Sequence, residues 1–343
     1  MWDLTNDTPF AATAGFARDA RGAEVRCSAV VAVFEPVDQH TCRQLEAGDP
    51  RLVPIFGGKD AAALLHDADL VPFRPNTDII ITGDAVAPGG RKAPWIDIGL
   101  DIGKLSRRLQ ARPAAVLRRG RWGWKVEPEE TGIDRLAIGW DVALGGRDPF
   151  APDQDDALCP DNPVGKGWSL NLSRARSGDS IAMPQLIRAG EDIQPDKPMP
   201  TPAGTGLVHP AWPVRGRHAG TFDAAWQRNV APLLPADFDP AFHQAAPADQ
   251  VYPGIMAGGE RVTITGMHEE GAWSFRLPQV VMAQTCRIGG ATDTARMRLI
   301  SVQIDAAQRR VRMVWNAATP CTGRDHLLER TALLVVQMSG IRA

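Results

Sequence analysis

Short apolar runs separated by turn residues recur along the whole chain. Residues 261–266 and 297–305 alternate apolar and polar positions, which is the period of a strand with one buried face. Residues 309–315 follow the second run after only a few residues, so these two segments are expected to pair as a hairpin. Further strands are predicted from β-branched or apolar runs at residues 24–34, 77–83 and 331–338.

Helical signals are few. Residues 59–65 are rich in Ala and Leu, and residues 222–229 are a second candidate, but both are so short that they need tertiary packing. The 33 glycines and 28 prolines are spread over the chain, and long helices tolerate neither residue in their interior. We therefore predict a mainly β fold: an antiparallel β-sandwich, or two sandwich-like lobes, with short helices and long ordered loops.

The middle of the chain has a different composition. Residues 148 to about 213 are rich in Pro, Gly, Asp and Ser, and proline cannot occupy a central strand. This stretch is expected to be ordered irregular structure across a β core, or a junction between lobes. We predict one domain over residues 1–343, with an alternative division into an N-terminal β lobe (1–147), a connecting region (148–213) and a C-terminal β lobe (214–343).

Composition and charge exclude several classes of function. The formal net charge is -2, whereas binders of duplex nucleic acid and of anionic membranes carry a basic excess. The N-terminal sequence MWDLTNDTPF has no signal-peptide pattern, and no apolar run approaches the ~20 residues of a membrane span. The five cysteines are scattered without a C-x-x-C pair, as expected for buried thiols in a reducing compartment. We therefore expect a cytoplasmic protein that binds neither nucleic acid nor membrane.

Motifs for catalysis or cofactor binding are incomplete. Gly57-Gly58-Lys59 resembles the end of a phosphate loop, but Asp60 follows where Ser or Thr is required, so a turn is expected. The chain contains neither G-x-S-x-G nor H-E-x-x-H. No metal-ligand spacing joins His209, His218 and His243, and the aspartates at 153, 155 and 156 do not match a calcium loop. We predict no catalytic residue, no cofactor and no metal.

The most basic segment, residues 118–125 (RRGRWGWK), has tryptophans interleaved with arginines. It could hold single-stranded nucleic acid by phosphate contacts and base stacking. It could equally be a strand with Arg on one side and Trp packed on the other, which the overall charge favours. Arg and Trp are also frequent in the energetic centres of protein interfaces.

The order of several unusual motifs resembles a family of domains of unknown function encoded in type VI secretion clusters, beside VgrG spikes, PAAR tips and toxic effectors. Earlier pieces are Asn6-x-Thr8-Pro9-Phe10, Pro75-x-Thr77-Asp78 and Asn162-Pro163-x-Gly165-x-Gly167. The most specific run is Arg217-x-Ala219-Gly220-Thr221-Phe222-Asp223-x-x-Trp226, Pro232-Leu233-Leu234-Pro235-x-Asp237-Phe238-Asp239-x-x-Phe242 and Ala245-Ala246-Pro247-x-Asp249-Gln250. One departure is Leu144, where many relatives have Phe before the double glycine.

This resemblance implies an adaptor or chaperone that helps to load an effector toxin or PAAR-tip protein onto the VgrG spike. It implies no catalytic residues. The sequence offers candidate partner-binding residues at Trp122, Trp124, Trp168, Trp212, Arg119, Arg121 and Arg217, and exposed tryptophans are also sought at Trp2 and Trp95.

Two other hypotheses remain open. A carbohydrate-active β-sandwich hydrolase would need converging groups among Asp223, Asp237, Asp239, His209 and His218. A structural component would stay in the secretion apparatus, whereas an adaptor would remain behind in the cytoplasm.

Overall fold

The computed structural model describes residues 3–58 and 62–342, and the fold is mainly β, as predicted. Its largest sheet has the strand order β18-β7-β23-β24-β3-β4-β26, and β2 also pairs with β3. The strands of this sheet are β2 (Ala11–Arg18), β3 (Glu24–Pro36), β4 (Cys42–Leu45), β7 (Thr77–Thr82), β18 (Val251–Tyr252), β23 (Arg298–Asp305), β24 (Arg310–Pro320) and β26 (Ile341–Arg342).

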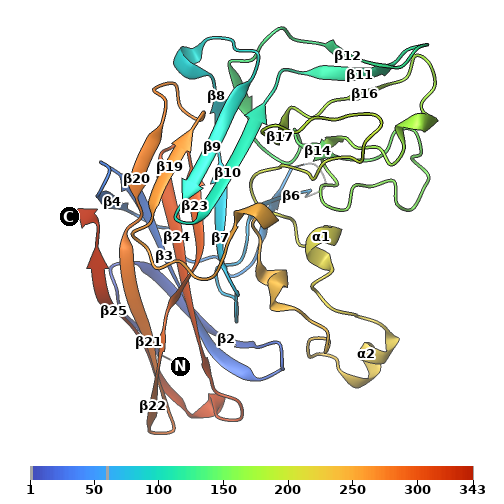
Figure 1. The fold of residues 1–343 in the computed structure, drawn as a ribbon. Coiled ribbons are helices and arrows are strands. Elements are labelled where there is room, and N and C mark those ends of the chain that lie inside the picture. The colour runs from blue at the N-terminus through green and yellow to red at the C-terminus, as the bar shows by residue number, and fades with distance from the viewer. Residues whose placement is uncertain (1–2, 59–61, 343) are drawn as a thin grey trace.

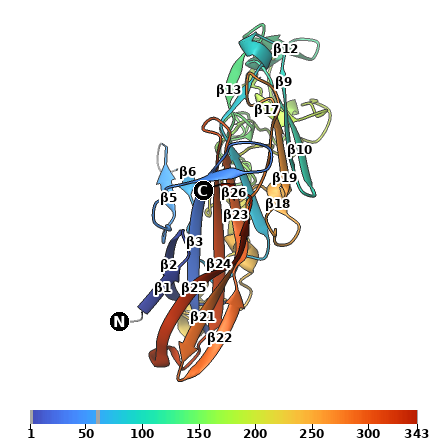
Figure 2. The same cartoon turned by 90° about the vertical axis from the view of Figure 1, so that its left-hand side faces the viewer.

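Two smaller sheets cover one face of this eight-stranded sheet (Figures 1 and 2). A four-stranded sheet contains β1 (Asp3–Asp7), β25 (Leu328–Ser339), β21 (Gln279–Ile288) and β22 (Ala291–Arg296). A five-stranded sheet contains β17 (Leu186–Arg188), β10 (Leu105–Ala111), β9 (Ile96–Ile102), β19 (Arg261–Thr265) and β20 (Trp273–Arg276). The result is an elongated sandwich in which the four-stranded and the five-stranded sheet both pack on the same face of the eight-stranded sheet.

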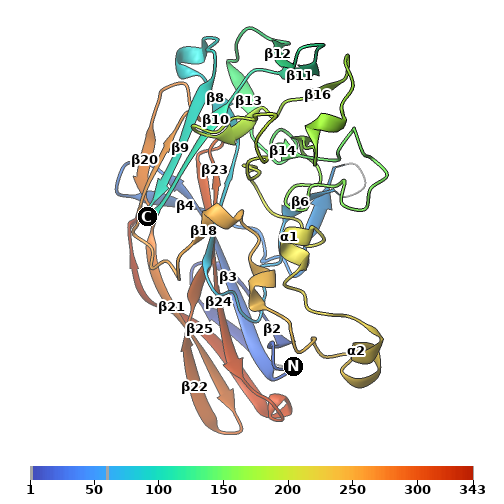
Figure 3. The same cartoon turned by 45° about the vertical axis from the view of Figure 1, so that its right-hand side comes forward.

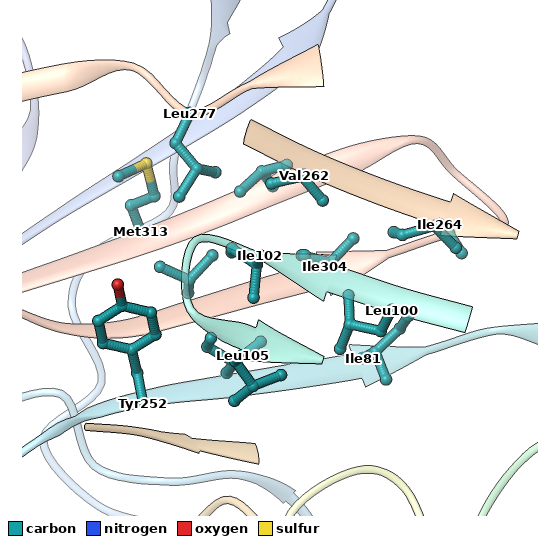
Figure 4. Packing of buried hydrophobic residues seen from close by; sticks show 14 of the residues in the cluster. Ile81, Leu100, Ile102, Leu105, Tyr252, Val262, Ile264, Leu277, Ile304 and Met313 are labelled. Carbon is teal, nitrogen blue, oxygen red and sulfur yellow. The ribbon is translucent and has the colours of Figure 1, made fainter. Parts of the chain in front are cut away.

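Alternating side chains build the core between these layers. Along β9, every second residue from Ile96 to Ile102 is buried, while Asp97 and Asp101 point the other way. These residues meet Ile81 and Ile304 of the large sheet in one continuous cluster (Figure 4). The opposite face of the large sheet, which we call the outer face, is also covered, because Ile80 packs against Leu207 and residues 245–246.

The predicted strands are confirmed. The segments expected at 24–34, 77–83, 261–266 and 331–338 correspond to β3, β7, β19 and β25, and β23 pairs antiparallel with β24 as the expected hairpin. The short helix expected at 222–229 is α2 (Ala224–Asn229). All five cysteines are buried and unpaired, and burial raises the pKa of Cys27 and of Cys42 to about 12. None of the helices in residues 3–58 and 62–342 is long and apolar enough to cross a bilayer.

The helix expected at residues 59–65 is wrong for the residues that the structure describes. Residues 59–61, which include Lys59 of the phosphate-loop-like sequence, lie outside the described residues. Ala63–His66 is strand β6, which pairs with β5 (Ile55–Gly57). Leu64 is buried against the outer face of the large sheet, so tertiary packing overrides the helix propensity of Ala and Leu.

The strands at the two ends of the chain are interleaved. β1 pairs with β25, β3 pairs with β24, and β9 pairs with β19. The alternative boundaries at 147 and 213 therefore do not separate two β lobes. Strands of each proposed lobe pair with strands of the other.

The segment between β13 (Arg135–Ala137) and β18 lies largely over the outer face (Figure 3). It is mostly irregular, but its strand β16 (Ser180–Ala182) forms a small sheet with β11 (Ala115–Arg119) and β12 (Trp124–Pro128), which precede it in the chain. Further short elements are β14 (Leu144–Gly145), β15 (Lys166–Gly167), α1 (Pro213–Gly216), η4 (Pro240–His243) and η5 (Ala248–Gln250).

A buried polar network fastens this irregular segment to the sheets. Asp78 on β7 is fully buried and accepts hydrogen bonds from the Gln244 side chain at 2.5 Å and from the Ala245 backbone at 2.8 Å. Arg74 Nη1 lies 3.3 Å from the same carboxylate. Burial raises the pKa of Asp78, and the Arg74 charge opposes that rise.

The network continues to the next sheet through Gln250. Its fully buried amide donates to the Ile79 carbonyl at 3.0 Å and accepts from Arg107 Nη1 at 2.6 Å. Arg107 also pairs with Asp249 at 2.9 Å. A few side chains thus supply the hydrogen bonds that an irregular segment cannot make within itself.

We predict that Asp78→Ala lowers the free energy of unfolding by about 3 kcal/mol or more, because Arg74 loses a buried partner and two donors lose their acceptor. Asp101→Ala removes an exposed carboxylate paired with Arg108 at 2.9 Å and should cost less than about 1 kcal/mol. Urea denaturation of both variants and the wild type checks the difference. Equal effects of the two substitutions would contradict the role given to Asp78.

Candidate functional site

Residues 219–239 form an arm that projects from the irregular segment, away from the sheets (Figure 1). The arm carries α2, and Asp223 caps this helix by accepting a hydrogen bond from the Trp226 backbone N–H at 2.7 Å. The cap satisfies one of the N–H groups that every helix leaves unpaired at its start. The Gly-Thr-Phe-Asp sequence therefore turns the chain directly into the helix.

Contacts within the arm make it self-supporting. The rings of Phe222 and Trp226 meet edge to face with centroids 4.7 Å apart, and the Trp226 indole N–H donates to the Leu233 carbonyl at 2.9 Å. Asp237 joins the two ends of the arm by accepting from the Thr221 backbone N–H at 3.0 Å and from its hydroxyl at 2.7 Å. These hydrogen bonds hold the pKa of Asp237 below its usual value.

A second carboxylate fixes the base of the arm. Asp239 lies 2.9 Å from His218 Nδ1 and accepts from the Ala241 backbone N–H at 2.8 Å; the bond to Ala241 is the main cause of its lowered pKa. The ring centroids of Phe238 and Phe242, four residues apart in the sequence, lie 6.0 Å from each other. The direction of the arm is therefore set by ordered contacts at its base.

The arm presents apolar side chains to solvent. Phe222 is 54% exposed and Leu233 is 36% exposed. Leu233 lies over the turn between β2 and β3, where a Cβ added to Gly22 would be 3.4 Å from its Cδ1 atom. A rigid loop with exposed apolar side chains is suited to contact another polypeptide.

A cavity of ≈ 430 Å³ opens beside the base of the arm, among α1, η4, η5 and β17. Arg215 lines it, but its three nitrogens are committed to the Phe242 carbonyl, the Val208 carbonyl and Asp67 at 2.7–2.9 Å. Arg188 pairs with Asp249 at 3.0 Å. The ionisable groups here thus hold the irregular segment together.

The residues considered for hydrolysis do not form one catalytic group. His218 and Asp239 are paired, whereas Asp223 and Asp237 are engaged by the arm itself. His209 packs instead against Phe56, with ring centroids 4.9 Å apart. Within the described residues, no three His, Cys, Asp or Glu side chains are placed to hold a metal ion.

The basic segment 118–125 is a hairpin, which corrects the expectation of a single strand. β11 and β12 pair so that Arg119 opposes Trp124, and the Gly120 N–H donates to the Gly123 carbonyl at 2.8 Å. Trp122 at the tip is 92% exposed, with the Arg121 guanidinium 5.2 Å from its ring centroid. Trp124 packs against Phe150 at 6.3 Å, with Arg119 5.7 Å from its ring.

The remaining partner-binding candidates are dispersed. Trp212 is only 6% exposed and meets Trp140 edge to face at 5.2 Å, so it belongs to the interior. Trp168 is half-buried, and its indole N–H is buried without a partner in the described part of the chain. Arg217 is exposed at the mouth of the cavity near the arm, Trp95 is exposed elsewhere, and Trp2 lies outside the described residues.

Sequence reasoning did not nominate Phe222 and Leu233. Both lie in the most specific motif run of the sequence, but their exposure depends on how the arm projects from the rest of the fold. One pattern in the sequence could have identified them. Each is an apolar residue flanked by Gly, Asp or Pro, which predicts a turn, and an apolar residue in a turn has no core nearby in which to be buried.

A comparison with protein-family models matches residues 21–316 to the family described as "Uncharacterized protein conserved in bacteria (DUF2169)". The chain belongs to this family. No curated protein and no solved structure matches it. The matched residues include the arm, the cavity at its base and the hairpin of β11 and β12, so all three are parts of the DUF2169 domain.

His243 of the DUF2169 domain is packed behind the arm. Its ring centroid lies 5.7 Å from that of Phe238 and 5.9 Å from that of Phe242. Burial first, and then the charges of Arg74 and Arg215, lower the pKa of His243 to about 4. The imidazole is therefore neutral in the folded protein at neutral pH.

We predict that His243 makes the fold acid-sensitive. In the unfolded chain it binds a proton near its ordinary pKa of about 6.5, so stability is lost as the pH falls from there towards 4. His243→Leu should remove up to about 3 kcal/mol of this loss. Urea denaturation between pH 7 and pH 4 measures it, with His40→Leu at an exposed position as control. Identical pH slopes in wild type and His243→Leu would refute the assignment.

Proposed function

We propose that this DUF2169 protein is a non-enzymatic adaptor of a bacterial type VI secretion system. It binds an effector toxin or a PAAR-tip protein in the cytoplasm and helps to load that protein onto the VgrG spike. The observation that carries the binding role is the arm of residues 219–239, an ordered projection with Phe222 and Leu233 exposed. The secretion role rests on the motif resemblance described above.

The composition of the arm supports a binding role. Its hydrogen bonds join residues of the arm to one another, so it keeps its shape while Phe222 stays exposed. A preformed surface loses little conformational freedom on binding. The exposed Trp122 at the hairpin tip offers a second aromatic contact, and aromatic anchors of this kind dominate the energy of many interfaces.

We predict that Phe222→Asp reduces partner capture about ten-fold or more, because a charge replaces an apolar anchor. Tagged protein is used to pull down partners from native lysate, and mass spectrometry quantifies PAAR, VgrG and effector proteins. Val37→Asp is the matched control, since Val37 is 43% exposed and lies far along the chain from the arm. Full capture by Phe222→Asp, or a wild-type pull-down without any of these proteins, would contradict the proposal.

An adaptor and a resident structural component differ in where the protein is found after firing. We expect the chain to stay in the cytoplasmic fraction while its partner appears in the secreted fraction. Blots of both fractions from secreting and non-secreting cells check this. Secretion of the chain in proportion to VgrG would favour the structural component.

A further inference from the structure

A second cavity of ≈ 440 Å³ lies between the outer face of the large sheet and the β5–β6 hairpin, apart from the arm and its base. Val33 and Ile80 of the sheet contribute apolar wall, and Leu64 and Leu207 contribute wall from the covering segments. The proposed adaptor function uses none of these residues. The cavity therefore needs an explanation of its own.

Arginines predominate among the ionisable side chains that line this cavity, beside the neutral Thr82, Gln303 and Gln308. Arg51, Arg310, Arg312 and His66 line it, against the single carboxylate of Asp305. Behind the lining, the buried carboxylate of Asp69 accepts from Arg312 Nη1 at 3.0 Å and from Nη2 at 2.6 Å. Asp69 also accepts from the Arg51 backbone N–H at 2.7 Å. The negative charge of Asp69 thus pairs with the Arg312 guanidinium and holds it in place.

The Arg51 guanidinium is left without a partner. Within the described residues it forms no ion pair and no side-chain hydrogen bond, and its Nη1 atom is buried without an acceptor. A guanidinium N–H that is buried without an acceptor is unfavourable unless an anion compensates it. His66 Nδ1 is likewise buried without a partner.

The electrostatics around His66 agree with this geometry. Desolvation is the largest cause of its lowered pKa, and the charges of Arg51 and Arg312 add to the effect. Burial is the largest cause of the lowered pKa of Arg51; the charge of Arg312 adds to it, and the charge of Asp69 opposes it. Positive charge therefore predominates among the ionisable groups at the cavity.

We propose that this cavity binds a small molecule that carries an oxyanion, a phosphate or a carboxylate, on a partly apolar body. Arg51 donates hydrogen bonds to the oxyanion, and the preoriented Arg312 adds a second positive charge beside it. Guanidinium groups bind both oxyanions through paired N–H donors. The apolar body packs against the walls formed by Val33, Leu64 and Leu207.

Isothermal titration calorimetry and thermal unfolding of the full chain test this, with phenyl phosphate and benzoate as probes and phenol as the neutral control at constant ionic strength. We expect one-to-one binding of at least one anion and a higher melting temperature in its presence, whereas phenol has neither effect. Binding of phenyl phosphate alone assigns a phosphate ligand, and binding of benzoate alone assigns a carboxylate.

Variants separate this cavity from other cationic surfaces. Arg51→Met should weaken binding about ten-fold or more, whereas Arg91→Met, at an exposed arginine outside the cavity, should leave it unchanged. Arg310→Met at the exposed mouth should weaken binding several-fold, and it decides the matter if Arg51→Met does not fold. The proposal is overturned if neither anion binds, if phenol binds as tightly, or if the folded cavity variants bind like the wild type.

Discussion

The buried carboxylate of Asp78 is the contact on which the rest of the outer face depends. The segment from β13 to β18 has little regular structure, so its backbone groups cannot satisfy one another as those of a sheet do. Asp78 of β7 accepts a hydrogen bond from the Ala245 backbone of this segment, and Gln250 of the segment donates to the Ile79 carbonyl of the sheet. These contacts hold η4 and η5 in place. The buried side chains of Asp78 and Gln250 therefore position the base of the arm and the nearby cavity.

Much of the fold could be predicted from hydrophobic periodicity. The strands β3, β7, β19 and β25 and the β23–β24 hairpin were all found because their burial alternates or because they are continuously apolar. The hairpin of β9 and β10 was missed although residues 96–102 alternate strictly and Gly103 adopts the positive φ of a tight turn. The helix expected at 59–65 failed for a different reason, because a buried Leu64 and strand pairing outweigh local propensity. Pairing between strands of distant sequence, such as β1 with β25, leaves no local signal.

The candidate sites were harder to predict, because exposure is a property of the assembled chain. Trp212 and Trp122 have the same side chain and stand in comparably glycine- and proline-rich sequence, yet one is packed against Trp140 and the other stands at a hairpin tip. Arg51 could not be predicted for the same reason. Its sequence neighbours form no motif, and its buried, unpartnered Nη1 atom at the cavity becomes evident only in the folded chain. Asp237 and Asp239 accept hydrogen bonds from backbone N–H groups, a role that aspartate commonly has in turns.

The two proposed binding surfaces differ in how the fold supports them, and this difference has a consequence for their chemistry. The arm is held by hydrogen bonds among its own residues, so its apolar surface can change without disturbing the sandwich. The cationic cavity is built from strands β3, β7, β23 and β24, whose other faces form the main core, so its position is fixed by the whole fold. A surface of the first kind suits partners that vary from one relative to another. A cavity of the second kind suits a ligand that stays the same, because changing its walls would require changing the sheet that holds the protein together.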